Sequence, residues 1–470
     1  MDKSVFSSLF EHWYKYWYWY IFGFCLIIFI LVITLTFNLG YSWDESVYLV
    51  HTAIFSGKTY AFNEFGFRPV FISIILIPFY AISHNLIFLR IIMILFSIIF
   101  LFILFLLLKR LFDFKLALVL TAIFGVSPLF VTISQYILTD ILGLIFVVLG
   151  LYFSHKYYED DKRTNLIFAS VFIALAFLTR FFYGSFLIFL FILILFKYKS
   201  FKSLLLDLVY MTAPFLVIIS PYLIFSKIVY GGFLTTLKNG QILVSHYDNP
   251  WYVYFIYLFN YWGLFFLGAI LGVYYLFRRI KNKKYGFYIS FLILFIFQLV
   301  YLAMTPHKEP RYSIPLAFDL VFIAGFGIYL WFKNHSDKIK KIAITIVFFL
   351  FLILVVITIH FYANNYFTKV WQTPKHMLPI NYLKDINAQG TIYVNTDVPQ
   401  YIYLFPHNYV ANVCWYNLND KNYETLFVKS GYLVTNIWAK PLDLNFLGNK
   451  IKLIKDLPPY KVYQVKLNSS

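Results

Sequence analysis

Long uninterrupted apolar runs are the dominant pattern in this sequence. The stretches 21–39 and 342–359 each approach the roughly 20 apolar residues that a membrane-crossing helix needs. A membrane-spanning barrel would instead show alternating segments of about ten residues. The pattern therefore predicts an all-α polytopic membrane protein.

Short basic turns separate these runs and set the predicted topology. If the N-terminus and all the basic turns are cytoplasmic, each apolar stretch between two turns crosses the membrane an even number of times. This predicts about eleven spans, at roughly 18–40, 86–108, 116–134, 137–154, 165–179, 182–196, 204–226, 253–277, 286–303, 312–332 and 342–362. The basic turns lie at 109–115, 156–163, 197–202, 278–284 and 333–341.

The apolar segment 69–82 is too short for a span. Its roughly fourteen residues fall below the 17 to 25 that a crossing needs, and a crossing here would put Lys109 and Arg110 outside. We predict an interfacial or re-entrant helix within a first external loop at 41–85.

An odd number of spans leaves the C-terminal tail outside. From about residue 363 the composition shifts to Asn, Asp, Lys and Pro, and short strand-like runs appear. The predicted domains are a transmembrane domain at 1–362 and a small external α/β domain at 363–470. The strand-like runs are Thr391–Val394, Tyr401–Leu404, Tyr432–Val434 and Val462–Val465.

Composition and charge agree with a membrane protein. The chain has 470 residues and is 61% hydrophobic and 13% charged, which excludes an ordinary soluble globule and a disordered chain. The formal net charge of +18 would suggest a nucleic-acid partner in a soluble protein. Here the cytoplasmic turns account for the basic residues, so the expected partners include membrane lipids and no nucleic acid.

Charged residues within a membrane protein are costly, so those outside the basic turns and the tail mark candidate chemistry. A helix starting after the first span would carry Asp44 in its first turn, with Glu45 beside it and Tyr48 on the same face. A simple N-cap is the alternative for this motif. Arg68 precedes Pro69 in the same loop, and it would alternatively snorkel to lipid headgroups.

Two further places carry isolated charges. Asp140 opens the predicted span 137–154, where a helix cap is the simpler interpretation. Arg180 lies between two apolar spans without an acidic neighbour in sequence, so it needs a distant carboxylate or a bound anion. Asp319, inside a predicted span, has no assigned role.

The most charged external stretch before the tail is the run from His307 to Tyr312. Its Lys308 and Arg311 would suit a phosphate, whereas the alternative is a turn anchored at the membrane interface. No spaced set of His or Cys residues accompanies His307, and no glycine-rich phosphate loop is present. A soluble nucleotide-sugar donor is therefore disfavoured. No cofactor is assigned, and a divalent metal ion is left open.

The order of these charged motifs along the chain resembles that in the GT-C superfamily of integral-membrane glycosyltransferases. The likeness is strongest to the protein-mannosyltransferase, aminoarabinose-transferase and RgtA/B/C/D-like group. The resemblance covers roughly residues 10–340 and is weak in the tail. Arg68 and Arg180 stand where the family commonly has lysine, and Phe181 replaces a glycine. The motifs are Asp44-Glu45 with Tyr48, Arg68-Pro69, Asp140, Leu178-Thr179-Arg180, Asn249-Pro250-Trp251-Tyr252, and His307-Lys308-Glu309-Pro310-Arg311-Tyr312.

The resemblance implies a dolichyl-phosphate-mannose type of enzyme. Such an enzyme moves a mannose-like hexose from a polyprenyl or dolichyl phosphate to a lipid, glycan or protein acceptor at the outer membrane face, in protein glycosylation or cell-envelope synthesis. Asp44 is the first candidate base, Glu45 the second, and Asp140 an orienting partner. The candidate contacts to the lipid phosphate are Arg68, Arg180, His307, Lys308, Arg311 and Tyr312, and those to the acceptor or sugar are Tyr48 and Glu309.

One direct displacement predicts inversion at the anomeric carbon. A transporter or flippase for lipid-linked sugars would share the hydrophobicity and the span count. Its site would lie near the bilayer midplane between repeated halves, whereas the predicted midplane is nearly uncharged and no halves match. A non-catalytic receptor or scaffold would leave the external charges unexplained.

Overall fold

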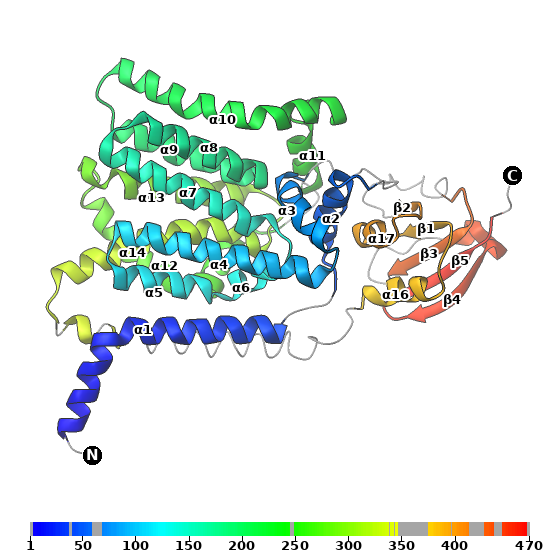
Figure 1. Cartoon of the computed structure of the whole chain (residues 1–470), viewed down its shortest axis with the longest axis horizontal. Coiled ribbons are helices and arrows are strands. Elements are labelled where there is room, and N and C mark those ends of the chain that lie inside the picture. Colours follow the sequence, from blue (N-terminus) through cyan, green and yellow to red (C-terminus); the bar gives the residue numbers. More distant parts are fainter. Residues whose placement is uncertain are drawn as a thin grey trace.

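A bundle of helices followed by a small mixed region of strands and helices makes up the protein (Figure 1). The computed structural model describes residues 3–36, 40–58, 68–244, 249–337, 339–342, 344–345, 375–395, 397–412, 427–436 and 444–467. The bundle contains α1 (Lys3–Thr36), α2 (Trp43–Phe55), α3 (Phe71–Ile82), α4 (Leu86–Leu111), α5 (Phe114–Gly125), α6 (Pro128–Ser134), α7 (Thr139–Asp160), α8 (Arg163–Thr179), η1 (Phe181–Ser185), α9 (Phe186–Phe196), α10 (Phe201–Tyr230), α11 (Thr235–Val244), α12 (Val253–Phe277), η2 (Lys283–Tyr285), α13 (Gly286–Met304), η3 (Pro310–Ser313) and α14 (Ile314–Asn334).

Most of the predicted spans that the structure describes coincide with single helices. Helix α4 covers the span predicted at 86–108, and α12 has the predicted bounds of 253–277. The span predicted at 116–134 is instead a pair, α5 and α6, bent by 68°. The bend follows from Pro128, which occupies the first turn of α6 and cannot continue the helix before it.

Seven described helices are long and apolar enough to cross a membrane, and the bent pair would make eight. Helices α3 and α8 and the pair of η1 and α9 are shorter apolar segments. Most of the last predicted span, 342–362, lies outside the described residues. The chain is thus an all-α polytopic membrane protein with a C-terminal α/β region, while the total of about eleven spans stays a prediction.

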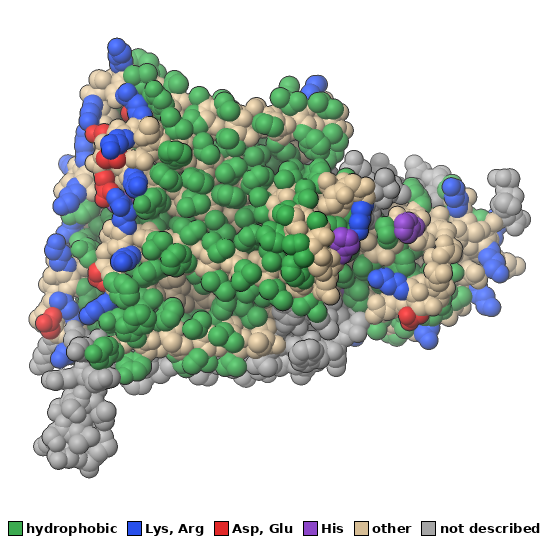
Figure 2. Space-filling model, in the orientation of Figure 1, with side chains coloured by type: hydrophobic (Ala, Val, Ile, Leu, Met, Phe, Trp, Pro, Cys, Tyr) green, Lys and Arg blue, Asp and Glu red, His purple; other side chains and the backbone are tan. Residues whose placement is uncertain are grey.

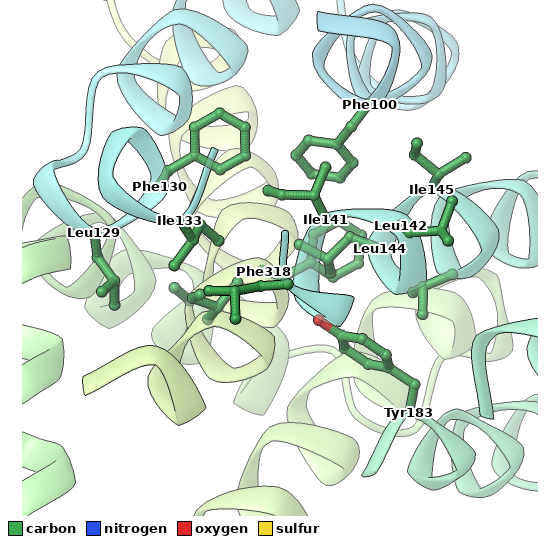
Figure 3. Close-up of a cluster of buried hydrophobic side chains, with 14 of the residues drawn as sticks. Phe100, Leu129, Phe130, Ile133, Ile141, Leu142, Leu144, Ile145, Tyr183 and Phe318 are labelled. Atoms are coloured by element: carbon green, nitrogen blue, oxygen red, sulfur yellow. The ribbon is translucent and has the colours of Figure 1, made fainter. Parts of the chain in front are cut away.

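The bundle core is built from large apolar side chains. Phe100 of α4 packs on Phe130 of α6 with ring centroids 5.6 Å apart, and on Phe318 of α14 at 6.4 Å (Figure 3). Helix α14 is buried along almost its whole length, so it is the central helix of the bundle. Helices that face outward carry exposed apolar side chains, which Figure 2 shows as a broad apolar surface.

The C-terminal region contains a five-stranded sheet in the order β2-β1-β3-β5-β4. Strands β2, β1 and β3 are parallel, and β5 pairs antiparallel with β3 and β4. The elements are α16 (Met377–Asp385), β1 (Thr391–Val394), α17 (Val398–Leu404), β2 (Val410–Asn412), β3 (Gly431–Asn436), η7 (Asn445–Lys450), β4 (Ile451–Leu457) and β5 (Tyr460–Val465).

Three of the four strand predictions in the tail are confirmed, and one is wrong. Residues 401–404 belong to the helix α17. Pro399 in the first turn presets helical backbone angles, and Tyr401, Ile402 and Tyr403 are all buried. A short run buried on all sides has no period that separates a strand from a helix.

Helix α17 packs against α2, so the sheet region adjoins one end of the bundle (Figure 1). Lys and Arg side chains gather at the opposite end (Figure 2). The predicted cytoplasmic turns therefore lie together at the end of the bundle far from α2.

Candidate active site

Helix α2 begins with a capping box. The Glu45 backbone N–H donates to the Ser42 hydroxyl at 3.4 Å, and the Ser42 N–H donates to a Glu45 carboxylate oxygen at 3.1 Å. Asp44 lies in the first turn and Tyr48 one turn later, as the sequence predicts. Because Ser42 is the N-cap, the Asp44 carboxylate is free for interactions with other segments.

Asp44 is held by two arginines from distant parts of the chain. Arg68, just before α3, pairs with its Oδ1, and Arg311 in η3 pairs with its Oδ2. Burial alone would raise the pKa of Asp44, but the two guanidinium groups and, farther off, Arg180 hold that pKa below its ordinary value. The carboxylate is therefore ionised, and it sits between two fixed cations.

Glu45 belongs to a second, fully buried ion pair. Arg90 of α4 donates to its two oxygens at 2.8 and 2.6 Å, and the Ile137 backbone N–H donates at 3.2 Å. Arg90 also donates to the Gly40 carbonyl at 2.7 Å. With these donors and Ser42, Glu45 ties α2 to α4 and to the segment before α7.

Asp140 and Arg180 form the third pair. Asp140 opens α7 and Arg180 ends α8, and the guanidinium binds Oδ1 of the carboxylate. Within the described residues, Oδ2 of Asp140 is buried without a hydrogen-bond partner. The Tyr312 ring lies 5.0 Å from the guanidinium of Arg180 and 5.5 Å from that of Arg311. Tyr312 thus connects this pair to the cluster around Asp44.

Within the run from His307 to Tyr312, Glu309 binds charged side chains and Lys308 binds backbone carbonyls. Glu309 accepts a hydrogen bond from His307 at 2.7 Å and pairs with Arg311 at 2.5 Å. Burial raises the pKa of Glu309, but Arg311 and His307 lower it by more, so the pKa lies below its ordinary value. Lys308 instead donates to the backbone carbonyls of Asn249 at 3.0 Å and Thr305 at 2.6 Å. In this arrangement Lys308 joins the loop before α12 to the end of α13.

The structure therefore brings the predicted residues from four separate stretches to one end of the bundle. Asp44, Asp140 and Glu309 are balanced there by Arg68, Arg180 and Arg311. A guanidinium carries five N–H donors in a planar fork, a geometry that matches both a carboxylate and a phosphate. Within the described ranges, no group of three or more His, Cys, Asp or Glu residues has the arrangement of a metal site.

Arg90 is the residue that the site prediction did not include. A charge within an apolar stretch was the available signal, because such a charge requires a partner. Its sequence position close to the predicted external end of the span 86–108 also fits contact with lipid headgroups, so the sequence could not identify Glu45 as its partner.

Comparison with known proteins gives the class of this fold. ArnT from Cupriavidus metallidurans, bound to undecaprenyl phosphate, aligns with a TM-score of 0.65 at 11% identity, covering 95% of this chain and 98% of that chain. The Archaeoglobus fulgidus oligosaccharyltransferase in its apo form aligns at 0.58 and 14% identity, covering 90% and 70%. Its complex as AglB with an inhibitory peptide and a dolichol-phosphate aligns at 0.55 and 14% identity, with the same coverage.

The chain is thus an integral, multi-pass membrane protein with the fold of these enzymes. Residues 68–225, about a third of the chain, match the family model described as dolichyl-phosphate-mannose-protein mannosyltransferase. The shared fold and the family match both support the resemblance of this chain to the GT-C superfamily of membrane glycosyltransferases. No curated protein matches it in sequence.

Proposed function

We propose that the protein transfers a mannose-like hexose from a polyprenyl or dolichyl phosphate to a lipid, glycan or protein acceptor. The observation that carries this proposal is the buried Asp44 carboxylate between Arg68 and Arg311, beside the pair of Asp140 and Arg180. One site thus combines an ionised carboxylate with three guanidinium groups. The family match, and neighbours whose structures contain undecaprenyl phosphate or dolichol-phosphate, support a lipid-phosphate donor.

In the proposed reaction, the acceptor hydroxyl oxygen attacks the anomeric carbon as the bond from that carbon to the phosphate oxygen breaks. The electron pair of the broken bond stays on the phosphate, and the hydroxyl proton passes to Asp44. Arg68, Arg180 and Arg311 offset the negative charge that grows on the phosphate in an oxocarbenium-like transition state. A single displacement inverts the anomeric carbon.

The same geometry assigns different roles to the two acids of α2. Asp44 contacts cations that would bind the substrate phosphate, whereas Glu45 is occupied by Arg90, Ser42 and Ile137. We therefore favour Asp44 as the base and treat Glu45 as the anchor of its helix. Asp140 orients Arg180, and the polar side chains of Tyr48 and Glu309 remain candidates for contacts to sugar or acceptor.

The charge distribution supports an external site. Basic residues gather at the end of the bundle opposite α2, and cytoplasmic ends of membrane proteins carry the excess of Lys and Arg (Figure 2). The site and the adjoining C-terminal region would then face the outside, where lipid-phosphate sugars are presented to acceptors.

The test is transfer of radiolabelled sugar from synthetic polyprenyl-phosphate mannose or glucose into a native membrane extract. We expect labelled product with the wild type and a loss of at least about a hundredfold with Asp44→Asn, the scale of a general base. Asp207→Asn is the matched control, because Asp207 pairs with Arg163 near the start of α8 and away from the site.

Equal labelling by the wild type and Asp44→Asn would remove Asp44 from the mechanism. A wild type that labels nothing from any lipid-phosphate sugar would contradict the proposal and favour the transporter.

A further inference from the structure

Where α17 packs against α2, one buried amide of the C-terminal region reaches the first turn of the helix that carries Asp44. Gln400 of α17 is 2% exposed. In the orientation that satisfies both of its polar atoms, its nitrogen donates to the Asp397 carbonyl at 2.7 Å and its oxygen accepts from the Trp43 backbone N–H at 3.3 Å. Trp43 is the first residue of α2, so no carbonyl of a preceding helical turn is available to its N–H.

Helix α17, which carries Gln400, is connected to the sheet through Asp397. The Tyr460 hydroxyl in β5 donates to a carboxylate oxygen of Asp397 at 2.9 Å, and Asp397 immediately precedes α17. The Tyr403 ring of the same helix packs on Tyr41, just before α2, with centroids 5.5 Å apart. These contacts therefore connect β5, through α17, to the first turn of α2.

Trp43 also contacts the candidate site, through Arg68. The guanidinium of Arg68 lies 5.5 Å from the centre of the Trp43 ring and pairs with Asp44, the next residue in α2. A shift of the Trp43 backbone would therefore move both Asp44 and a cation that holds it. Misplacement of a reacting group by about 1 Å can cost a hundredfold in rate.

We propose that Gln400 is a positioning residue through which the C-terminal α/β region holds the first turn of α2, and with it Asp44, in the reactive position. This inference rests on the proposed function. It assigns the region a role in the rate of transfer that is separate from any role in acceptor choice.

Two variants of the full-length protein isolate the amide oxygen. Gln400→Met keeps the length of the side chain and removes both polar atoms. Gln400→Glu keeps the shape of the side chain, and burial favours its neutral form, in which the hydroxyl donates to the Asp397 carbonyl and the other oxygen accepts from the Trp43 N–H. Gln389→Met is the control, because Gln389 is exposed in the loop before β1 and its side chain donates to Asn387 in the same loop.

We expect Gln400→Met to lower kcat about tenfold with the KM for the donor within about twofold, and Gln400→Glu to restore at least about half of the wild-type kcat. A merely structural role predicts equal losses in both variants. A kcat for Gln400→Met within about twofold of wild type, or no rescue by Gln400→Glu, would overturn the inference.

Amide hydrogen exchange tests the same contact without any substrate. The peptide that covers the first turn of α2 should exchange about tenfold faster in Gln400→Met than in wild type, with little change in Gln400→Glu or Gln389→Met. Unchanged exchange in Gln400→Met overturns the inference even if the wild type transfers no sugar. Loss of transfer by the wild type, in contrast, contradicts only the proposed function.

Discussion

Asp44 shares its two oxygens between two arginines, and this sharing would set its strength in the proposed role of base. Arg68 and Arg311 stabilise the ionised carboxylate, and the same stabilisation makes it a weaker acceptor of protons. A donor phosphate that draws the guanidinium groups toward itself would strengthen the base. Binding of the donor and activation of the acceptor would thereby be coupled at one residue.

This arrangement predicts a pH dependence. Burial raises the pKa of Asp44, but Arg68, Arg311 and Arg180 together lower it by more, so the net pKa lies below the ordinary value. A base with a depressed pKa stays ionised as the pH falls, so kcat/KM should be nearly constant from about pH 8 down to about pH 5.

Removing one arginine should shift the acid limb of this profile. Arg311→Gln weakens the stabilisation of the ionised form, so the pKa of Asp44 rises and activity is lost at a higher pH, by about one unit or more. The measurement is the midpoint of kcat/KM against pH in the transfer assay. Arg278→Gln, among the basic residues after α12, is the control, and an unchanged midpoint in Arg311→Gln would show that another group is the base.

At this scale the sequence could predict the chemical groups better than their pairing. Asp44, Arg68 and Arg311 stand out because charged residues are rare and costly in such a chain. Their pairing depends on contacts between segments far apart in sequence, and Arg90 lacked any local signal for its partner. Gln400 is uncharged and lies in a polar tail, so composition and motif gave no reason to select it.

The helices of the bundle pack most closely where glycines face each other. A Cβ atom on Gly272 of α12 would collide with the Ile323 carbonyl of α14, and one on Gly327 would collide with the Gly272 backbone. Close approach through small residues drives helix association in membranes, where apolar side chains gain little by leaving lipid. The central position of α14 thus depends on these small residues.

A methyl group at this crossing should separate the helices. We expect Gly272→Ala to destabilise the protein by about 1 to 3 kcal/mol, the cost of overpacking, measured as thermal unfolding in detergent. Gly263→Ala in the same helix is the control, because its Cβ would meet nothing within 4 Å. That variant should be neutral or slightly stabilising. Equal behaviour of the two variants would show that the crossing tolerates the methyl group.

Elements could be predicted from the sequence when length alone distinguishes them. Apolar runs of about 20 residues are unambiguous, which is why α4 and α12 coincide with their predicted spans, and the short run 69–82 forms the separate helix α3. In the C-terminal region the elements have only three to nine residues, and the sequence pattern does not distinguish the helix α17 from a strand. Strand β4 was missed because polar Lys452, Lys455 and Asp456 obscure its apolar positions.

On the scale of the whole molecule, the two ends of the bundle differ in chemistry. One end carries the paired acids and arginines of the site and adjoins the C-terminal sheet, and the other carries Lys and Arg side chains in excess of Asp and Glu (Figure 2). The positive-inside rule turns this difference into an orientation, with the site outside. An odd number of spans would connect a cytoplasmic N-terminus to an external C-terminal region.

Single cysteines can test that orientation. In a background with Cys25 and Cys414 changed to Ser, Gln389→Cys introduces a thiol in the C-terminal region and Lys281→Cys introduces one after α12; both positions are exposed. We expect a membrane-impermeant maleimide to label Gln389→Cys on intact cells and Lys281→Cys only after the membrane is opened, because Lys and Arg clusters are retained in the cytoplasm. The reverse pattern would place the site inside, where the proposed transfer to an external acceptor could not occur.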